Sequence, residues 1–371
     1  MRSLLVLLLL FTFLLGVNAL GDGFKLLGRG LLDSFFTATQ NPFTGLMVGI
    51  LATTLVQSSS VTTSLIVGLV AAPVNPLPIA NAVPMVMGAN IGTTVTNTIV
   101  SLGHMGRKHE FYRAFSVATC HDFFNYMAVV ALLPLELLTG YLRKTATALS
   151  SLLTGLAGGV DYDSPLKGLL KAALQPIKTL IQAITASERV QAVLLIVIAA
   201  ALIYVALMML VRVMRRAMHS RVEVIVSRGL HRSRLVAIIV GVLVTVMVQS
   251  SSITTSLLVP LAGAGLITLG QAFPITVGAN IGTTVTALLA ALAVTGPNAR
   301  WGITIALVHL LFNLTATVLI FSSPRIRNVP LAAARWLASI AVKSRKWALL
   351  YVVLLFYGLP ALFAVLNRLL D

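Results

Sequence analysis

The chain has 371 residues, of which 58% are hydrophobic and only 10% are charged, and its mean hydropathy is +0.97. A soluble domain carries about 25% charged residues, so this composition excludes an ordinary soluble protein and indicates an integral membrane protein. The net charge of +17 would suggest nucleic-acid binding in a soluble chain, but basic residues gathered on the cytoplasmic side of a membrane explain it better.

Apolar segments recur along the chain, and several have the roughly 20 residues that are needed to cross a bilayer core. The first, at residues 4–20, is predicted to be a transmembrane helix, although residues 1–20 also fit a cleaved signal peptide. We therefore predict an all-α polytopic membrane protein. Its further crossings are predicted at 123–138, 190–211, 303–321 and 347–365.

A polar octet interrupts the apolar pattern twice. Residues 57–64 read Gln-Ser-Ser-Ser-Val-Thr-Thr-Ser, and residues 249–256 repeat them with Ile in place of Val. Hydroxyl and amide groups that face lipid without partners are costly, so each octet is predicted to line a polar cavity or to interrupt its helix. The alternative is a seam of small residues between packed helices.

A second block, Gly-Ala-Asn-Ile-Gly-Thr-Thr-Val-Thr, occurs at 88–96 and again at 278–286. Its glycines free the backbone, and a proline stands four residues before each copy, so broken helices are predicted here too. Small cations bind amide and hydroxyl oxygens, and free N–H groups at helix starts suit anions. The blocks therefore predict a joint site for Na⁺ and an oxyanion. Their cation-ligand candidates are Asn90, Thr93, Thr94, Asn280, Thr283 and Thr284.

The repeated blocks divide the chain into a first copy at 1–150, an inter-repeat segment at 151–189 that is predicted to be external, and a second copy at 190–371. Basic residues follow the Gly-Ala-Asn block in the first copy but precede the octet in the second. If basic loops are cytoplasmic, the two copies have inverted topology, which is typical of secondary transporters. The Arg-rich stretch 212–234 is then a cytoplasmic loop, with the N-terminus inside and the C-terminus outside.

Asp122 is an acid at the entrance of a predicted crossing, and the second copy has leucine at that position. A carboxylate at such a depth indicates function, so Asp122 is predicted to hold an extra cation. The alternative is an interfacial helix cap. His121 and His309 precede Asn125 and Asn313 by four residues and are predicted to form buried hydrogen-bonded pairs with them, with a role in proton relay as the alternative.

Enzyme chemistry is not expected. The octet serines do not lie in a Gly-x-Ser-x-Gly turn, and no histidine or acid stands beside them in sequence to activate a hydroxyl. The single cysteine, Cys120, excludes an intrachain disulfide and a multi-cysteine metal site. No cofactor is predicted other than Na⁺ as a coupling ion.

Both octets, both Gly-Ala-Asn blocks and the segment His121-Asp-Phe-Phe-Asn125 resemble the type II sodium–phosphate cotransporters. The resemblance implies sodium-driven symport of inorganic phosphate by an inverted-repeat fold with elevator-like transport and scaffold parts. It implies phosphate ligands at Gln57, Ser58, Ser59, Ser60, Gln249, Ser250, Ser251 and Ser252. It adds Thr62, Thr63, Thr254, Thr255 and Asp122 to the sodium ligands.

Asp122 matches the acid of the electrogenic members of that family, whereas electroneutral members carry glycine there. Because the large cysteine-bridged loop of animal members is missing, the chain is similar to a compact bacterial form in the inner membrane. Two alternatives stay open. One is a symporter of another oxyanion, or one that uses H⁺. The other is an uncoupled channel or a non-transporting receptor.

Overall fold

The computed structural model describes residues 2–27, 37, 39–156, 165–230, 233–294 and 296–370, and the regular elements within them are all helices. Six stretches of the described residues are long and apolar enough to cross a membrane. The prediction of an all-α polytopic membrane protein is therefore confirmed. The six are α1 (Arg2–Leu27), α7 (Lys108–Thr139), α10 (Glu188–Leu230), α13 (Leu269–Ala293), α14 (Ala299–Phe321) and Arg345–Phe363.

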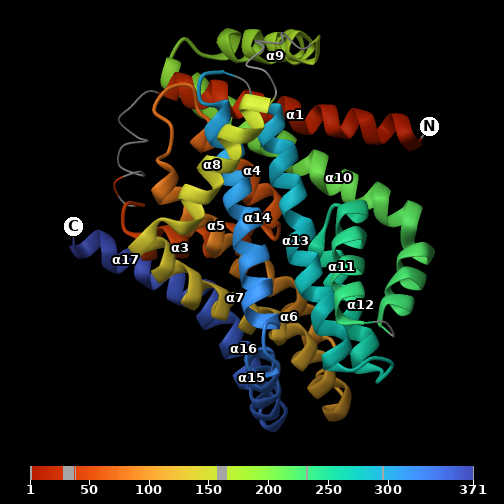
Figure 1. Cartoon of the computed structure of the whole chain (residues 1–371). Coiled ribbons are helices and arrows are strands. Elements are labelled where there is room, and N and C mark those ends of the chain that lie inside the picture. The colour runs from red at the N-terminus through yellow and green to blue at the C-terminus, as the bar shows by residue number, and fades with distance from the viewer. Residues whose placement is uncertain are drawn as a thin grey trace.

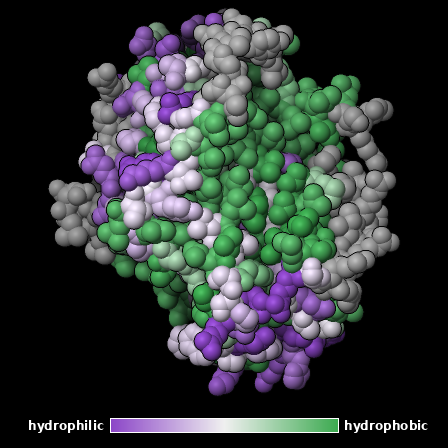
Figure 2. Space-filling model, in the orientation of Figure 1, coloured by the Kyte–Doolittle hydropathy of each residue, from purple (hydrophilic) through white to green (hydrophobic). Residues whose placement is uncertain are grey.

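The last of these stretches runs through α16 (Arg345–Val353), a short π-helix η1 (Leu354–Gly358) and α17 (Leu359–Leu370). Two further helices lie at opposite ends of the bundle in Figure 1, α9 (Pro165–Ile184) at the top and α15 (Pro324–Lys343) at the bottom. Figure 2 shows apolar residues over the centre and right of the visible face, and hydrophilic residues at its lower end and on its upper left side. That distribution suits a protein whose waist is surrounded by lipid.

Shorter helices carry the repeated blocks. In the first copy they are α3 (Pro42–Val56), α4 (Ser59–Val70), α5 (Ile79–Thr93) and α6 (Val95–Leu102), and in the second α11 (Arg234–Val248) and α12 (Ser251–Gly263) precede α13. Helix α3 packs along α5, and α11 packs along α13. The first octet begins directly after α3, and the second begins directly after α11.

The prediction that the Gly-Ala-Asn blocks break their helices holds in the first copy, where α5 ends at Thr93 inside the block, and is wrong in the second. The first block lies in α5 and at the start of α6, which follow each other with one residue between, and the second lies inside α13. In both copies the glycines serve a close helix crossing. A Cβ on Gly88 would overlap the Leu46 carbonyl oxygen of α3, and a Cβ on Gly278 would overlap the Ile238 carbonyl oxygen of α11.

The Arg-rich stretch 212–234 was predicted to be a loop, and this is also wrong. The backbone of α10 continues as one helix of 43 residues to Leu230. The stretch contains no proline and its one glycine lies near the helix end, so it keeps good helix propensity. Residues 231 and 232 lie outside the described residues.

Segment 151–189 holds the end of α8 (Tyr141–Leu156) and all of α9, and residues 157–164 lie outside the described part. Its external location stays a prediction.

The main hydrophobic core joins both copies and α1. Phe13 and Leu20 of α1 are buried in it, and α1 packs along α10. Phe124 of α7 meets Phe273 of α13 with ring centroids 6.1 Å apart. The helices that carry the repeated polar blocks are thereby held against one another at the centre of the molecule.

Candidate functional site

Each octet breaks its helix at the same place. Gln57 and Gln249 have left-handed backbone conformations with φ of 58° and 57°, which few non-glycine residues adopt. Ser58 and Ser250 then cap the next helix, and each hydroxyl accepts a hydrogen bond from the N–H three residues later, at 3.3 and 3.4 Å. The predicted interruption is thus confirmed. It consists of the glutamine and the first serine of each octet.

One cavity of about 260 Å³ lies where the two breaks meet. All eight residues to which the resemblance gave a phosphate-binding role line it. Three apolar residues and one cation of α10 complete the wall together with Ile253. The lining is Gln57, Ser58, Ser59, Ser60, Gln249, Ser250, Ser251, Ser252, Ile253, Leu207, Met208, Val211 and Arg212.

Both glutamine side chains are fixed in equivalent ways. The Gln57 amide donates to the Thr54 carbonyl at 2.6 Å and accepts from the Thr96 hydroxyl at 3.0 Å. The Gln249 amide donates to a backbone carbonyl at 2.7 Å and accepts from the Thr286 hydroxyl at 3.1 Å. Since Thr96 and Thr286 end the Gly-Ala-Asn blocks, each octet is tied to the block of its own copy.

The cavity suits an anion in three respects. Helices α4 and α12 both begin at it, and the first turn of a helix leaves N–H groups without helical partners and with a favourable dipole for negative charge. The serine hydroxyls add further donors. Arg212 adds a positive charge that lies outside every repeated block, and the sequence reasoning missed it because nothing local links α10 to the octets.

The predicted sodium-binding threonines do not line this cavity, but they share one hydrogen-bonding state. Each hydroxyl donates to a backbone carbonyl three or four residues earlier, at 2.7 to 3.2 Å, and the single Thr255 proton is shared with the Asn97 oxygen at 2.9 Å. When its proton is used in such a hydrogen bond, a hydroxyl can offer only its oxygen lone pairs to a further ligand. A cation binds to such lone pairs. The eight threonines that share this state are Thr62, Thr63, Thr93, Thr94, Thr254, Thr255, Thr283 and Thr284.

A buried amide network joins the two copies. Asn280 donates to the Asn125 side chain at 2.8 Å, and Asn125 donates to the carbonyl of Asn90 at 3.0 Å. The Nε2 atom of His121 lies 2.6 Å from the Asn280 oxygen, and its Nδ1 lies 3.3 Å from the Asn97 amide nitrogen. Because the Asn280 oxygen must accept, the network assigns the His121 proton to Nε2.

Asn97 extends this network to the second octet. Its oxygen accepts hydrogen bonds from the Thr255 hydroxyl at 2.9 Å and the Ser256 hydroxyl at 3.0 Å. The sequence reasoning missed Asn97, although the repeat held a signal, since the corresponding residue of the second copy is Ala287.

The predicted pairing of each histidine with the asparagine of its own helix is wrong. His121 bonds to Asn97 and Asn280, and the His309 ring nitrogens have no hydrogen-bond partner among the described residues. Asn313 instead donates to the backbone carbonyl of His309 and to the Asn90 oxygen. The asparagine side chains thus bond to residues of other helices. His309 lacks the partner that Asn97 provides to His121, because the residue of the second copy that corresponds to Asn97 is Ala287.

Asp122 is fully buried inside α7, so the alternative of an interfacial helix cap is wrong. One carboxylate oxygen accepts from the Tyr351 hydroxyl at 2.6 Å and from the Thr98 hydroxyl at 3.3 Å. The other oxygen has no partner in the described part of the chain, and neither has the Tyr126 hydroxyl one turn further along α7. Tyr351 comes from α16 and was not predicted.

Comparison with known proteins gives a consistent result. The sequence profile of the family described as Na⁺/Pi-cotransporter matches residues 12–158 and 202–363. Sodium-dependent phosphate transport protein 2B of Homo sapiens is 31% identical over 97% of this chain and 64% of that protein. Sodium-dependent phosphate transport protein 2A of Rattus norvegicus is 34% identical over 95% of this chain and 66% of that protein. The chain thus spans just under two thirds of the length of these relatives. No solved structure gives a significant match.

Proposed function

Because this chain belongs to the Na⁺/Pi-cotransporter family, we propose that it is a secondary active transporter that carries inorganic phosphate across the membrane together with Na⁺. The observation that carries the proposal is the meeting of both Gln-Ser-Ser-Ser segments, with two helix N-termini, at one cavity. Two helix N-termini and a set of hydroxyls are the donors that an oxyanion needs. The names of the relatives point to the same substrate and the same coupling ion.

Phosphate, in this proposal, binds at the octets. The four residues Gln57–Ser60 and the four residues Gln249–Ser252 surround it, and Arg212 supplies a positive charge at the wall formed by α10. A divalent anion would still leave uncompensated negative charge beside a single arginine. Co-bound Na⁺ ions would balance that charge, which gives a physical reason for coupled rather than independent binding.

The Na⁺ ions are proposed to bind behind the octets. The eight back-bonded threonines named above, with Asn90 and Asn280, offer oxygen atoms, and the buried polar side chains of the described residues include no Lys or Arg. The amide network links these groups to the second octet through Asn97. Filling a Na⁺ site would therefore reorganise groups that contact the octet helices, and phosphate affinity would rise with Na⁺ concentration.

Asp122 is proposed to hold one further Na⁺, which makes transport electrogenic. Its unpartnered carboxylate oxygen and the unpartnered Tyr126 hydroxyl lie on one helix, one turn apart. A buried carboxylate without a charged partner is unfavourable, and a bound cation would supply the missing charge.

The chain is proposed to be an inverted repeat, with a first copy at 1–150 and a second at 190–371. Transport is proposed to occur by an elevator-like movement of one part of the protein against a scaffold. The same break at the octet and the same close crossing at a glycine of the Gly-Ala-Asn block occur in both copies. The proposed location is a bacterial inner membrane with the N-terminus in the cytoplasm and the C-terminus outside. No enzymatic step is part of this cycle.

Phosphate uptake into liposomes tests the function. Liposomes that contain the purified protein should accumulate radiolabelled phosphate when an inward Na⁺ gradient is applied at clamped voltage, and the uptake should stop when choline replaces Na⁺. Excess sulfate should leave uptake unchanged. Uptake that ignores the Na⁺ gradient would indicate an uncoupled channel, and uptake driven by a pH gradient alone would indicate H⁺ coupling.

The shared site has a separate test. Ser59→Ala and Ser251→Ala each remove one hydroxyl from the cavity wall, and a hydrogen bond to a charged group contributes about 1.5–3 kcal/mol. Each variant should therefore raise the phosphate concentration for half-maximal uptake by roughly tenfold or more, and should also raise the Na⁺ requirement.

Ser339→Ala, which removes an exposed hydroxyl on α15, is the matched control and should leave both quantities unchanged. If Ser59→Ala affected phosphate alone and Ser251→Ala affected Na⁺ alone, the octets would form two sites instead of one.

A further inference from the structure

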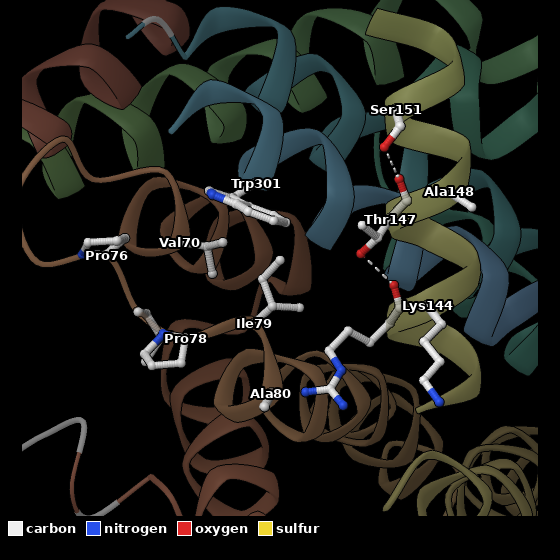
Figure 3. Close-up of a pocket in the computed structure, with 12 residues that line it drawn as sticks. Val70, Pro76, Pro78, Ile79, Ala80, Lys144, Thr147, Ala148, Ser151 and Trp301 are labelled. Carbon is white, nitrogen blue, oxygen red and sulfur yellow. Dashed lines mark hydrogen bonds between the residues drawn. The ribbon is translucent and has the colours of Figure 1, made fainter. Parts of the chain in front are cut away.

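A larger cavity, of about 730 Å³, lies away from the octets and shares no lining residue with their cavity. Its walls are the α4–α5 connection, one face of α8 and the start of α14. Figure 3 shows Lys144, Thr147 and Ser151 along α8, with Trp301 and Ile79 across the space from them. Its volume is in the range of small-molecule sites.

Most of the lining is apolar. Its polar groups are of two kinds, hydroxyls that bond to the helix backbone and cations that are exposed. The Thr147 hydroxyl donates to the Arg143 carbonyl at 2.7 Å and the Ser151 hydroxyl donates to the Thr147 carbonyl at 2.8 Å, so both serve the helix backbone. Arg143 and Lys144 are exposed at one end of the cavity. Neither forms an ion pair with any residue that the structure describes.

The nearby acid does not neutralise these cations through a direct contact. Glu136 turns its carboxylate to the backbone N–H groups of Leu142 and Arg143, at 2.6 and 3.3 Å, where it caps the start of α8. The cavity therefore combines an apolar interior with a positively charged end.

The cavity also lies beside the ends of two candidate membrane spans. Helix α7 ends at Thr139, just before Arg143, and α14 begins just before Trp301. Both helices are candidate spans, so the cavity is placed where spans end, at the interface in which tryptophan is enriched. Arg300 lies over the Trp301 ring at 5.0 Å from its centroid and adds a third cation to this region.

We infer that this cavity binds an anionic phospholipid, with an acyl chain against the apolar lining and the headgroup phosphate at Arg143 and Lys144. Lys and Arg residues close to a membrane surface attract anionic lipid headgroups. A free phosphate ion would use the cations but would leave the apolar volume unexplained. A zwitterionic lipid would fill the volume but would leave the cationic end without a negatively charged partner. The inference does not depend on the proposed transport function.

Tryptophan quenching tests the site directly. The chain has three tryptophans, so Trp336→Phe/Trp347→Phe leaves Trp301 as the only emitter. In liposomes, brominated-chain phosphatidylglycerol should quench Trp301 at a much lower mole fraction than brominated phosphatidylcholine does. In Arg143→Gln/Lys144→Gln on that background, the preference should fall by roughly tenfold, because each basic residue near anionic lipid contributes substantially to its attraction.

Arg345→Gln/Lys346→Gln removes an equal pair of charges at the start of α16 and is the matched control, which should keep the preference. Equal quenching by the two lipids, or an unchanged preference in Arg143→Gln/Lys144→Gln, would overturn the inference. Relief of the quenching by brominated phosphatidylglycerol on addition of millimolar inorganic phosphate would assign the cationic end to the free ion, and this outcome too would overturn the inference. Elution of each variant as a single folded species in detergent keeps these outcomes interpretable.

Discussion

Phosphate uptake by the Asp122→Gly variant is expected to continue but to lose its response to membrane voltage. The wild-type carboxylate is buried, its unpartnered oxygen is available to a cation, and no cationic side chain bonds to it in the described structure. Removing the carboxylate removes the reason for a further Na⁺ to bind. Each net charge that crosses the membrane is worth about 2.3 kcal/mol per 100 mV, so the loss of one charge per cycle is a large effect.

The measurement is the charge moved per phosphate, from uptake and current recorded on the same liposomes at several clamped voltages. Tyr351→Phe is the matched control. It removes the hydrogen bond of 2.6 Å to Asp122 but keeps the carboxylate. This variant should therefore remain electrogenic and change only its Na⁺ affinity. If Asp122→Gly moved the same charge per phosphate as the wild type, the further Na⁺ site would lie elsewhere.

Gly278→Ala is expected to destabilise the second copy strongly. The new Cβ would overlap the Ile238 carbonyl oxygen of α11, and Gly241 makes the reciprocal contact with the Ile275 carbonyl oxygen of α13. Overpacking commonly costs about 1–3 kcal/mol. Here the obstacle is backbone rather than a flexible side chain, so we expect a cost of about 3 kcal/mol or more.

Helix α13 itself offers the control for this experiment. Gly270 lies in the same helix, and a Cβ there would meet no atom within 4 Å. Gly270→Ala should be neutral or slightly stabilising, because alanine is the better helix former by about 1 kcal/mol. Thermal unfolding midpoints in one detergent, followed by size-exclusion chromatography, compare the two variants. Equal midpoints would show that α11 and α13 can separate at little cost.

Features that depend on the polarity of a short segment could be predicted from the sequence. The octets are expected to interrupt their helices because seven polar groups among eight residues cannot all face lipid, and the breaks at Gln57 and Gln249 agree with this. The Gly-Ala-Asn blocks show the limit of the same reasoning. Glycine permits both a broken backbone and a close helix crossing, and only the position of the partner helix decides between them.

Contacts between distant helices could not be predicted. Tyr351 reaches Asp122 across 229 residues of sequence, and Arg212 joins the cavity from a helix that contains neither repeated block. Tyr351 stands in no distinctive local pattern, and the Arg-rich stretch that begins at Arg212 does not indicate which of its side chains would reach the octets. Asn97 is an intermediate case, because its replacement by alanine in the second copy marks an asymmetry, although its role as a bridge appears only when α6 and α12 are seen together.

The amide network also has a consequence for how the chain is made. Asn125 and its donor Asn280 are 155 residues apart, and at about 5–20 residues per second the ribosome needs roughly 8 to 30 s to make that interval. During this time the first copy is in the membrane, but Asn125 and His121 lack the hydrogen bonds that Asn280 of α13 will form with them. Polar groups without hydrogen-bond partners are costly in a membrane. A ribosome that stalls before Leu269 would therefore leave a fragment suited to degradation. The two copies, although they are separate stretches of sequence, complete their folding as one unit.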